Sequence, residues 1–122
     1  EGEVDAIASD HAPHSREDKE AGASGLIGLE TTLGLVLTHL VSTNVVEPIR
    51  AAELLSTAPA RIFGLPAGSL EPGAAADMVL IDPEREWTVD AEVMHSKSAN
   101  CPYDGWRLRG RAAATFVGGK RV

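Results

Sequence analysis

A short apolar run near the start of the chain ends in an acid and two histidines, and this feature constrains the fold most. Residues 4–9 are mainly small or β-branched, which is typical of a short buried strand. The sequence DHAPH follows directly at residues 10–14. Because polar side chains that follow buried parallel strands gather at one edge of the fold, we expect a functional site at residues 10–14.

Asp10 has two interpretations from the residues alone. A carboxylate at the C-terminal end of a barrel strand can coordinate a metal ion and carry a proton. An aspartate in the pattern Asp-x-x-Pro is also commonly a helix cap or a turn residue. The two interpretations stay open at this point.

The two histidines have different expected roles. Pro13 removes the regular helix that would align His11 and His14 on one metal ion, so we do not expect them to ligate it jointly. His14 can instead hydrogen-bond an anionic group of a substrate, whereas His11 packs against the loop or orients it.

Composition restricts the function classes. The chain of 122 residues carries a net charge of −7 and has no Lys/Arg cluster, which argues against nucleic-acid and anionic-membrane partners. No apolar run approaches the roughly 20 residues that span a bilayer, and no signal peptide is visible. A single cysteine, Cys101, excludes an internal disulfide. We therefore expect a soluble, cytoplasmic protein.

The first half of the chain predicts a loop and then helices. Residues 11–25 are rich in charge and small residues, with Arg16 and Lys19 interpreted as part of a solvated face. An apolar stripe at residues 33, 36, 37, 40 and 41 predicts one helix, ended by residues 42–44. Pro48 begins a second helix. Thr57 is the expected N-cap of a third, which Gly64 ends.

The second half predicts a small β module. Residues 77–82 form an expected strand that is closed by Pro83, and residues 87–89 form a short extended piece. Residues 108–117 and 121–122 predict a hairpin across Gly118 and Gly119. These strands are too few for a closed sandwich, so we expect partner strands from elsewhere.

Several segments together resemble the dihydroorotases of the cyclic amidohydrolase superfamily. They are ASDHAPH at residues 8–14, GLIGLET at 25–31, GAAADMVLID at 73–82 and NCPYDGW at 100–106, followed by residues 110–119. The resemblance covers essentially the whole chain in order. It implies an α/β fold: residues 1–65 form the C-terminal part of a metal-dependent (β/α)₈ barrel, with its last strand and helices. Residues 66–122 form part of a small β-sandwich.

The resemblance also implies an activity and roles for four residues. Dihydroorotases interconvert N-carbamoyl-L-aspartate and L-dihydroorotate in pyrimidine synthesis on one or two zinc ions. Asp10 matches a zinc ligand that takes a proton from the attacking hydroxide and passes it to the leaving amide nitrogen. His14 matches a residue that binds the substrate carboxylate. Ser24 and Gly25 match a substrate-binding backbone pair, although Ser24 replaces an aromatic residue and the preceding loop is short.

Two alternatives remain beside this interpretation. Allantoinases and hydantoinases share the aspartate but are not expected to carry a histidine at the position of His14. A non-catalytic subunit that scaffolds aspartate transcarbamoylase is the other alternative, and the presence of both Asp10 and His14 favours an active parent. The resemblance further implies a homo-oligomer.

The resemblance places the remaining metal ligands before Glu1, and a catalytic zinc site needs about three protein ligands. We therefore predict that the isolated 122-residue polypeptide binds zinc weakly and does not turn over dihydroorotate. The measurement is a hydrolysis assay with added zinc on a sample of verified mass. Zinc-dependent ring opening by this polypeptide alone would contradict the prediction.

Overall fold

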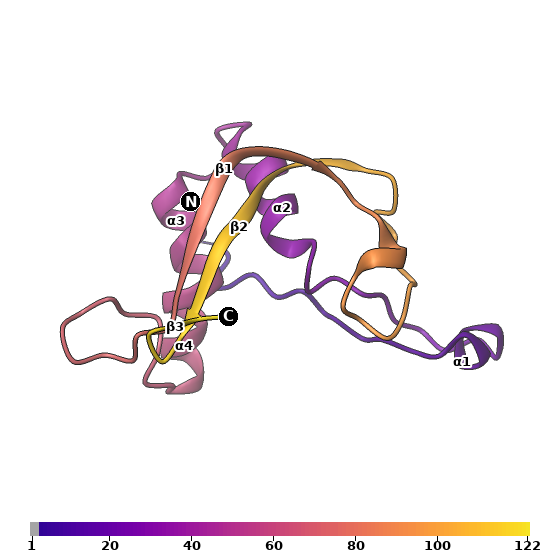
Figure 1. Cartoon of the computed structure of the whole chain (residues 1–122), viewed down its shortest axis with the longest axis horizontal. Coiled ribbons are helices and arrows are strands. Elements are labelled where there is room, and N and C mark those ends of the chain that lie inside the picture. The colour runs from indigo at the N-terminus through magenta and orange to yellow at the C-terminus, as the bar shows by residue number, and fades with distance from the viewer. Residues whose placement is uncertain (1–2) are drawn as a thin grey trace.

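A computed structural model describes residues 3–122, in which helices from the first half lie against a bent antiparallel sheet from the second half (Figure 1). The sheet has three strands in the order β1-β2-β3. The short helix α1 (Arg16–Glu20) lies at a tip far from the sheet (Figure 1). Within the described residues, no helix is long and apolar enough to cross a bilayer.

The first predicted helix is confirmed. Helix α2 (Thr32–Val36) continues directly into the π-helical turn η1 (Leu37–Val41), and the chain turns at Asn44, where φ is +58°. Val36 on the predicted apolar stripe is buried. The helix contacts the sheet, and Leu37 of the stripe packs against Gly110 there.

The second and third predicted helices are one helical stretch. Helix α3 (Pro48–Ala52) runs through a π-helical turn, η2 (Glu53–Thr57), into helix α4 (Ala58–Phe63). The prediction that Thr57 caps a new helix is wrong, because Thr57 has helical backbone angles and its hydroxyl donates to Gly68 O at 3.0 Å. The wider turn accommodates Pro59, which lacks the N–H of a regular helical bond. Gly64 ends the helix in the left-handed conformation, as predicted.

The strand predicted to end at Pro83 continues past it. Strand β1 (Met78–Thr88) pairs with strand β2 (Arg107–Val117), and Asp82 lies opposite Arg111 while Glu86 lies opposite Arg109. Residues 83–85 therefore form a bulge that keeps Pro83, which has no N–H, out of the ladder. The predicted extended piece belongs to the same strand.

The predicted hairpin at the end of the chain is confirmed. Strand β2 turns through Gly118 and Gly119 into strand β3 (Lys120–Arg121), and both glycines have positive φ. Residues 3–122 form a single three-stranded sheet and neither a closed barrel nor a two-sheet sandwich. Apolar residues of β1 stay exposed, among them Val79 and Leu80.

The N-terminal segment differs from its prediction in two ways within the described residues. Within residues 3–122 no other strand lies beside residues 4–9, so the predicted strand is not formed there; Ile7 N donates instead to Leu54 O at 3.0 Å. The predicted loop at 11–25 contains helix α1. Its first turn is stabilised by a capping box, in which the Ser15 hydroxyl accepts from Asp18 N and the Asp18 carboxylate accepts from Ser15 N.

The helix α2–η1 lies close to the sheet at Gly110 of β2. Gly110 has φ of +89°, and a Cβ placed there would lie on the Leu37 side chain, 2.9 Å from its Cβ. The Gly110 carbonyl accepts a hydrogen bond from Trp87 Nε1 at 3.1 Å. Leu108, two residues earlier on the same strand, is one of the most buried side chains. The position therefore requires glycine for both its backbone and its packing.

We predict that Gly110→Ala destabilises the fold more than Gly73→Ala does. Gly73 has a similar φ of +94° but open space around its Cα, so both variants share a backbone cost of about 1 kcal/mol. The overlap with Leu37 adds about 2 kcal/mol for Gly110→Ala alone. The measurement is the free energy of unfolding in urea; equal losses for the two variants would contradict the close approach.

Candidate functional site

Three segments that are distant in the sequence meet at the predicted site: residues 9–14, 25–30 and 95–100. Ala12 N donates to Leu26 O at 2.9 Å, and Ile27 N donates to Asn100 O at 3.0 Å. His11 and Leu26 form an isolated parallel bridge. The segment around Leu26 therefore lies between the other two segments and is hydrogen-bonded to each.

Asp10 lies at the start of this junction with an unusual backbone. Its φ is +47°, a left-handed conformation that aspartate tolerates better than most residues, and it is exposed. The helix-cap interpretation does not hold, because the nearest helix begins at Arg16 and is capped by Ser15. Asp10 takes part in none of the ion pairs among residues 3–122.

His11 orients the loop, as the sequence indicated. Its Nδ1 accepts hydrogen bonds from Gly28 N at 3.2 Å and from Leu29 N at 3.3 Å. Because Nδ1 is an acceptor, these bonds assign the proton of the neutral imidazole to Nε2. His11 thus connects residues 9–14 to the start of helix α2.

His14 and Gly25 are in direct contact. Gly25 has φ of +139°, and a Cβ at this position would lie 2.7 Å from His14 Cδ2 and 2.6 Å from Ala12 O. The His14 imidazole therefore packs against the bare Cα of Gly25, a contact that a larger residue would prevent. Ser24 precedes Gly25 directly and is exposed. The structure brings these three predicted site residues together.

The carbonyl of Gly25 has two donors that the sequence analysis did not anticipate. Lys19 Nζ donates to Gly25 O at 3.0 Å and also to Ala23 O at 2.6 Å, while Asn100 Nδ2 donates to Gly25 O at 2.8 Å. The prediction that Lys19 belongs to a solvated face is wrong, because its ammonium group folds back onto the loop. No local pattern reveals these contacts.

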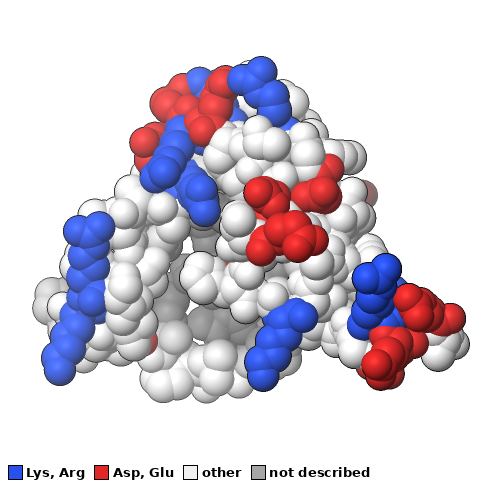
Figure 2. Space-filling view, turned by 45° about the vertical axis from the view of Figure 1, so that its right-hand side comes forward, with Lys and Arg blue, Asp and Glu red and all other residues white. Residues whose placement is uncertain are grey.

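A cleft of about 430 Å³ opens beside His14. It is lined by His14, Arg16, Lys19, Lys97, Ser98, Ala99 and Asn100. The lining contains three cations and no acid, although Arg16 pairs at the exposed surface with Glu20 at 3.3 Å. Basic and acidic side chains are otherwise intermixed on the face that Figure 2 shows. The cleft is therefore a local electropositive site suited to a small anion.

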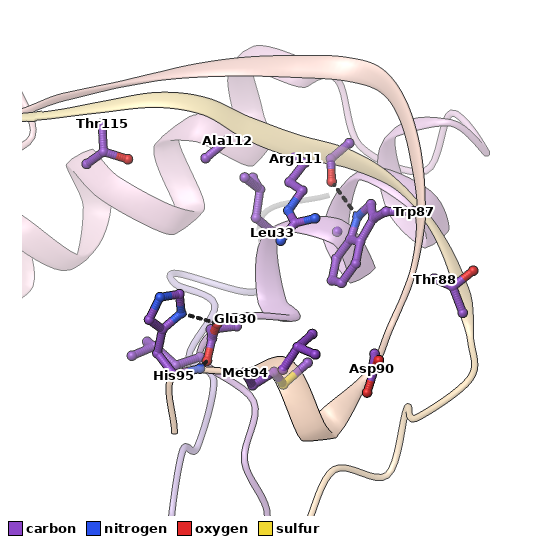
Figure 3. A pocket seen from close by; sticks show the side chains of 14 residues that line it. Glu30, Leu33, Trp87, Thr88, Asp90, Met94, His95, Arg111, Ala112 and Thr115 are labelled. Carbon is purple, nitrogen blue, oxygen red and sulfur yellow. Dashed lines mark hydrogen bonds and ion pairs between the residues drawn. The ribbon is translucent and has the colours of Figure 1, made fainter. Parts of the chain in front are cut away.

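A second cavity of about 470 Å³ lies between helix α2, strands β1 and β2, and residues 90–95 (Figure 3). At its edge the Glu30 carboxylate accepts hydrogen bonds from His95 N at 2.9 Å and Ser96 N at 3.3 Å, and lies 3.1 Å from His95 Nδ1. Partial burial by itself raises the pKa of Glu30, but the hydrogen bonds from His95 and Ser96 outweigh it and hold that pKa below its usual value. Glu30 thereby tethers residues 95–100 to the start of helix α2.

The Asp18 carboxyl, in the capping box of helix α1, is a second perturbed acid. Hydrogen bonds from the Ser15 side chain and backbone hold the pKa of Asp18 below its usual value. Both perturbed carboxyl groups therefore anchor segments that line the basic cleft, one through α1 and one through residues 95–100.

The metal-binding capacity of the described residues is limited. Within residues 3–122, no three side chains of His, Cys, Asp or Glu lie close enough to hold a metal ion. Asp10 offers one exposed carboxylate, whereas Nδ1 of His11 already accepts the hydrogen bonds from Gly28 N and Leu29 N. These residues can supply one ligand to a shared metal site and do not complete a site by themselves.

The chain belongs to the amidohydrolase family, because the model of this family matches residues 2–122. It is 48% identical to a dihydroorotase of Anaeromyxobacter dehalogenans (strain 2CP-1 / ATCC BAA-258) over 126 aligned residues, covering 100% of this chain and 29% of that protein. It is 44% identical to a dihydroorotase of Pelotomaculum thermopropionicum, covering 30% of that protein. The chain thus spans less than a third of the length of these relatives.

Solved structures agree with this family and its fold. An L-hydantoinase (dihydropyrimidinase) from Arthrobacter aurescens superimposes with a TM-score of 0.92 at 34% identity, over 99% of this chain and 29% of that one. A D-hydantoinase (dihydropyrimidinase) from Thermus sp. gives a TM-score of 0.90 at 28% identity, over 97% of this chain and 28% of that one. The amidohydrolase fold expected from the sequence is confirmed.

The tether at Glu30 predicts a pH-dependent stability. Because the pKa of Glu30 is lowered on folding, its contribution is complete above the ordinary glutamate value of 4.5 and is lost as the pH falls through the lowered value. We predict that Glu30→Gln reduces the free energy of unfolding by about 1 kcal/mol at pH 7. The difference from the wild type should shrink toward pH 3.

The measurement is chemical denaturation of both proteins over this pH range. Glu92→Gln is the matched control, because Glu92 is an exposed acid close to His95 in the sequence. This control should leave the stability nearly unchanged at every pH. A Glu30→Gln difference that stays constant from pH 7 to pH 3 would contradict the tether.

Proposed function

We propose that the protein containing this chain is a dihydroorotase, which interconverts N-carbamoyl-L-aspartate and L-dihydroorotate in pyrimidine synthesis. The observation that carries the proposal is the electropositive cleft beside His14, which packs against Gly25. Both compounds carry a carboxylate at physiological pH, and a cleft with three cations and no acid suits that group. The 48% identity to a dihydroorotase supports the same activity.

For the architecture, we propose that residues 1–65 form the last strand and helices of a (β/α)₈ barrel and that residues 66–122 form part of a β-sandwich. Residues 4–9 belong to no helix within the described residues, which is compatible with a strand that pairs with a neighbour outside them. The exposed apolar residues of β1, such as Val79 and Leu80, are suited to packing against further strands.

In the proposed mechanism, His14 and the backbone of Ser24 and Gly25 bind the substrate carboxylate and orient the ring. Asp10, on the exposed turn that follows residues 4–9, would hold one or two zinc ions together with ligands from outside this chain. Bound zinc would polarise the ring carbonyl and supply a nucleophile near neutral pH. The Asp10 carboxylate accepts a proton during the attack and delivers it to the leaving amide nitrogen.

A hydantoinase-type activity is the second candidate, supported by the TM-score of 0.92 to an L-hydantoinase. The rings of hydantoin and dihydrouracil lack the carboxylate that a basic cleft would bind. His14 in the electropositive cleft therefore favours the dihydroorotase. A non-catalytic role beside aspartate transcarbamoylase is less favoured, since Asp10 and His14 are both present.

The proposal also covers the partners of the enzyme and its location in the cell. The partners are the small-molecule substrate, further copies of the same protein and, in the scaffolding alternative, aspartate transcarbamoylase. Pyrimidine precursors are made in the cytoplasm, which we propose as the location. A single cysteine, Cys101, suits that reducing compartment.

Variants of Asp10 and His14 in the complete protein test the proposal. We predict that Asp10→Asn lowers kcat for dihydroorotate by about 1,000-fold, because the proton carrier is lost. His14→Ala raises KM by about tenfold with a much smaller change in kcat, since it removes binding common to the ground and transition states. The measurement is steady-state kinetics on dihydroorotate and on dihydrouracil, the same ring without the carboxylate.

Asp5→Asn and His39→Ala are the controls, because both residues are exposed and lie outside the cleft. They should leave the kinetics close to those of the wild type. If the wild type prefers dihydrouracil, the hydantoinase-type candidate replaces the dihydroorotase. Near-normal kinetics of Asp10→Asn would remove its assigned role.

A further inference from the structure

We propose that Lys19 and Asn100 are positioning residues: they hold the Gly25 carbonyl from two sides and thereby place the surface on which His14 binds the substrate carboxylate. The inference rests on the proposed function for the nature of the ligand. The positioning itself rests on hydrogen bonds between three segments of the chain. We call the Lys19–Gly25–Asn100 arrangement the carbonyl clamp.

The carbonyl clamp uses the full acceptor capacity of one oxygen. A carbonyl oxygen has two lone pairs, and Gly25 O accepts hydrogen bonds from Lys19 Nζ at 3.0 Å and from Asn100 Nδ2 at 2.8 Å. Asn100 also accepts a hydrogen bond from Ile27 N through its own backbone oxygen at 3.0 Å. One asparagine therefore fixes the chain on both sides of Leu26.

Lys19 closes the other side of the loop. Its ammonium group binds Ala23 O at 2.6 Å as well as Gly25 O, so one cation bridges two carbonyl groups of the turn that carries Ser24. Helix α1 carries Lys19, and the capping box at Ser15 stabilises that helix. Charge-assisted hydrogen bonds of this kind are stronger than neutral ones, which compensates for ordering a long side chain.

The clamp matters for binding because Gly25 supports His14. A φ of +139° is accessible mainly to glycine, and a flexible glycine keeps one conformation only when its surroundings restrain it. The His14 ring packs on the bare Cα of Gly25, so a displaced Gly25 displaces the ring. Loss of the clamp should therefore weaken binding of the carboxylate while the proton-transfer group, Asp10, keeps its place.

Lys97 supplies a matched control within the same cleft. It lines the cleft and carries the same charge as Lys19 but is exposed and makes none of the hydrogen bonds to the 23–25 turn. Lys97→Met removes a cleft cation alone. Lys19→Met removes a cation and the clamp, and its unbranched side chain retains the aliphatic packing. Comparing the two variants separates positioning from simple electrostatic attraction.

The test uses the complete protein with Lys19→Met, Asn100→Leu and Lys97→Met. We expect Lys19→Met and Asn100→Leu each to raise KM for dihydroorotate by about tenfold with kcat within about twofold of the wild type. Lys97→Met should raise KM by less than about threefold. Lys19→Arg, which can still donate to two carbonyls, should recover part of the lost affinity. An equal KM increase in Lys97→Met and Lys19→Met would overturn positioning by Lys19.

Amide hydrogen exchange gives a second readout that does not depend on activity. We expect peptides covering residues 21–27 to exchange at least about tenfold faster in Lys19→Met and Asn100→Leu, with the rest of the protein and Lys97→Met unchanged. Unchanged exchange in both variants would overturn the clamp whatever the kinetics show. Faster exchange with an unchanged KM would overturn its role in substrate positioning.

The two readouts also separate this inference from the proposed function. If the wild type does not turn over dihydroorotate, the proposed function fails and the substrate role of the clamp fails with it. The exchange measurement still decides whether Lys19 and Asn100 hold the Gly25 carbonyl. Matching thermal melts of the variants and the wild type show that the fold is retained. Where the melt of Lys19→Met differs from that of the wild type, Asn100→Leu carries the test alone.

Discussion

The candidate site depends on one short piece of backbone at residues 26 and 27, which is hydrogen-bonded on both sides. Leu26 O accepts from Ala12 N on one side, and Ile27 N donates to Asn100 O on the other. The side chain of Ile27 is only 2% exposed, and its burial stabilises the fold by about 2 kcal/mol. This burial anchors the same residues in the core. Asp10 and His14 are placed through the first of these contacts, and the basic cleft through the second.

The local charge of the cleft contrasts with that of the whole chain. The net charge is −7, yet the residues that line the cleft beside His14 include three cations and no acid. Lysines and arginines placed in this way raise the concentration of an anionic ligand at one point of an otherwise acidic protein. Acidic groups such as Glu30 and Asp18 are used instead to hold the segments that form the walls, through hydrogen bonds that keep their pKa values low.

Features set by neighbouring residues could be predicted from the sequence, whereas features set by distant contacts could not. The apolar stripe of the first helix, the Gly64 cap and the Gly118–Gly119 turn depend on local spacing and backbone preference, and all are confirmed. The cap predicted at Thr57 is absent, because a π-helical turn that local propensity does not indicate continues the helix past Pro59. The bulge at Pro83 likewise depends on its partner strand.

The same distinction applies to the site. The resemblance to dihydroorotases implies four site residues, Asp10, His14, Ser24 and Gly25. The structure brings three of them together: His14, Ser24 and Gly25. Their assigned roles remain predictions. The sequence does not identify Lys19 and Asn100 as partners of Gly25, because Asn100 contacts it across 75 positions and Lys19 lies in a stretch with the pattern of a solvated loop. Asn100 belongs to a segment that supported the resemblance, which was the one available signal.

The most direct test of the account is a crystal structure of the complete protein with zinc and dihydroorotate bound. The account predicts an Asp10 carboxylate oxygen about 2.0–2.2 Å from zinc and a substrate carboxylate within about 3 Å of the His14 imidazole. It also predicts that this carboxylate lies beside Gly25, in the cleft lined by Lys19 and Asn100. A zinc site that excludes Asp10, or a carboxylate bound away from His14, would contradict it.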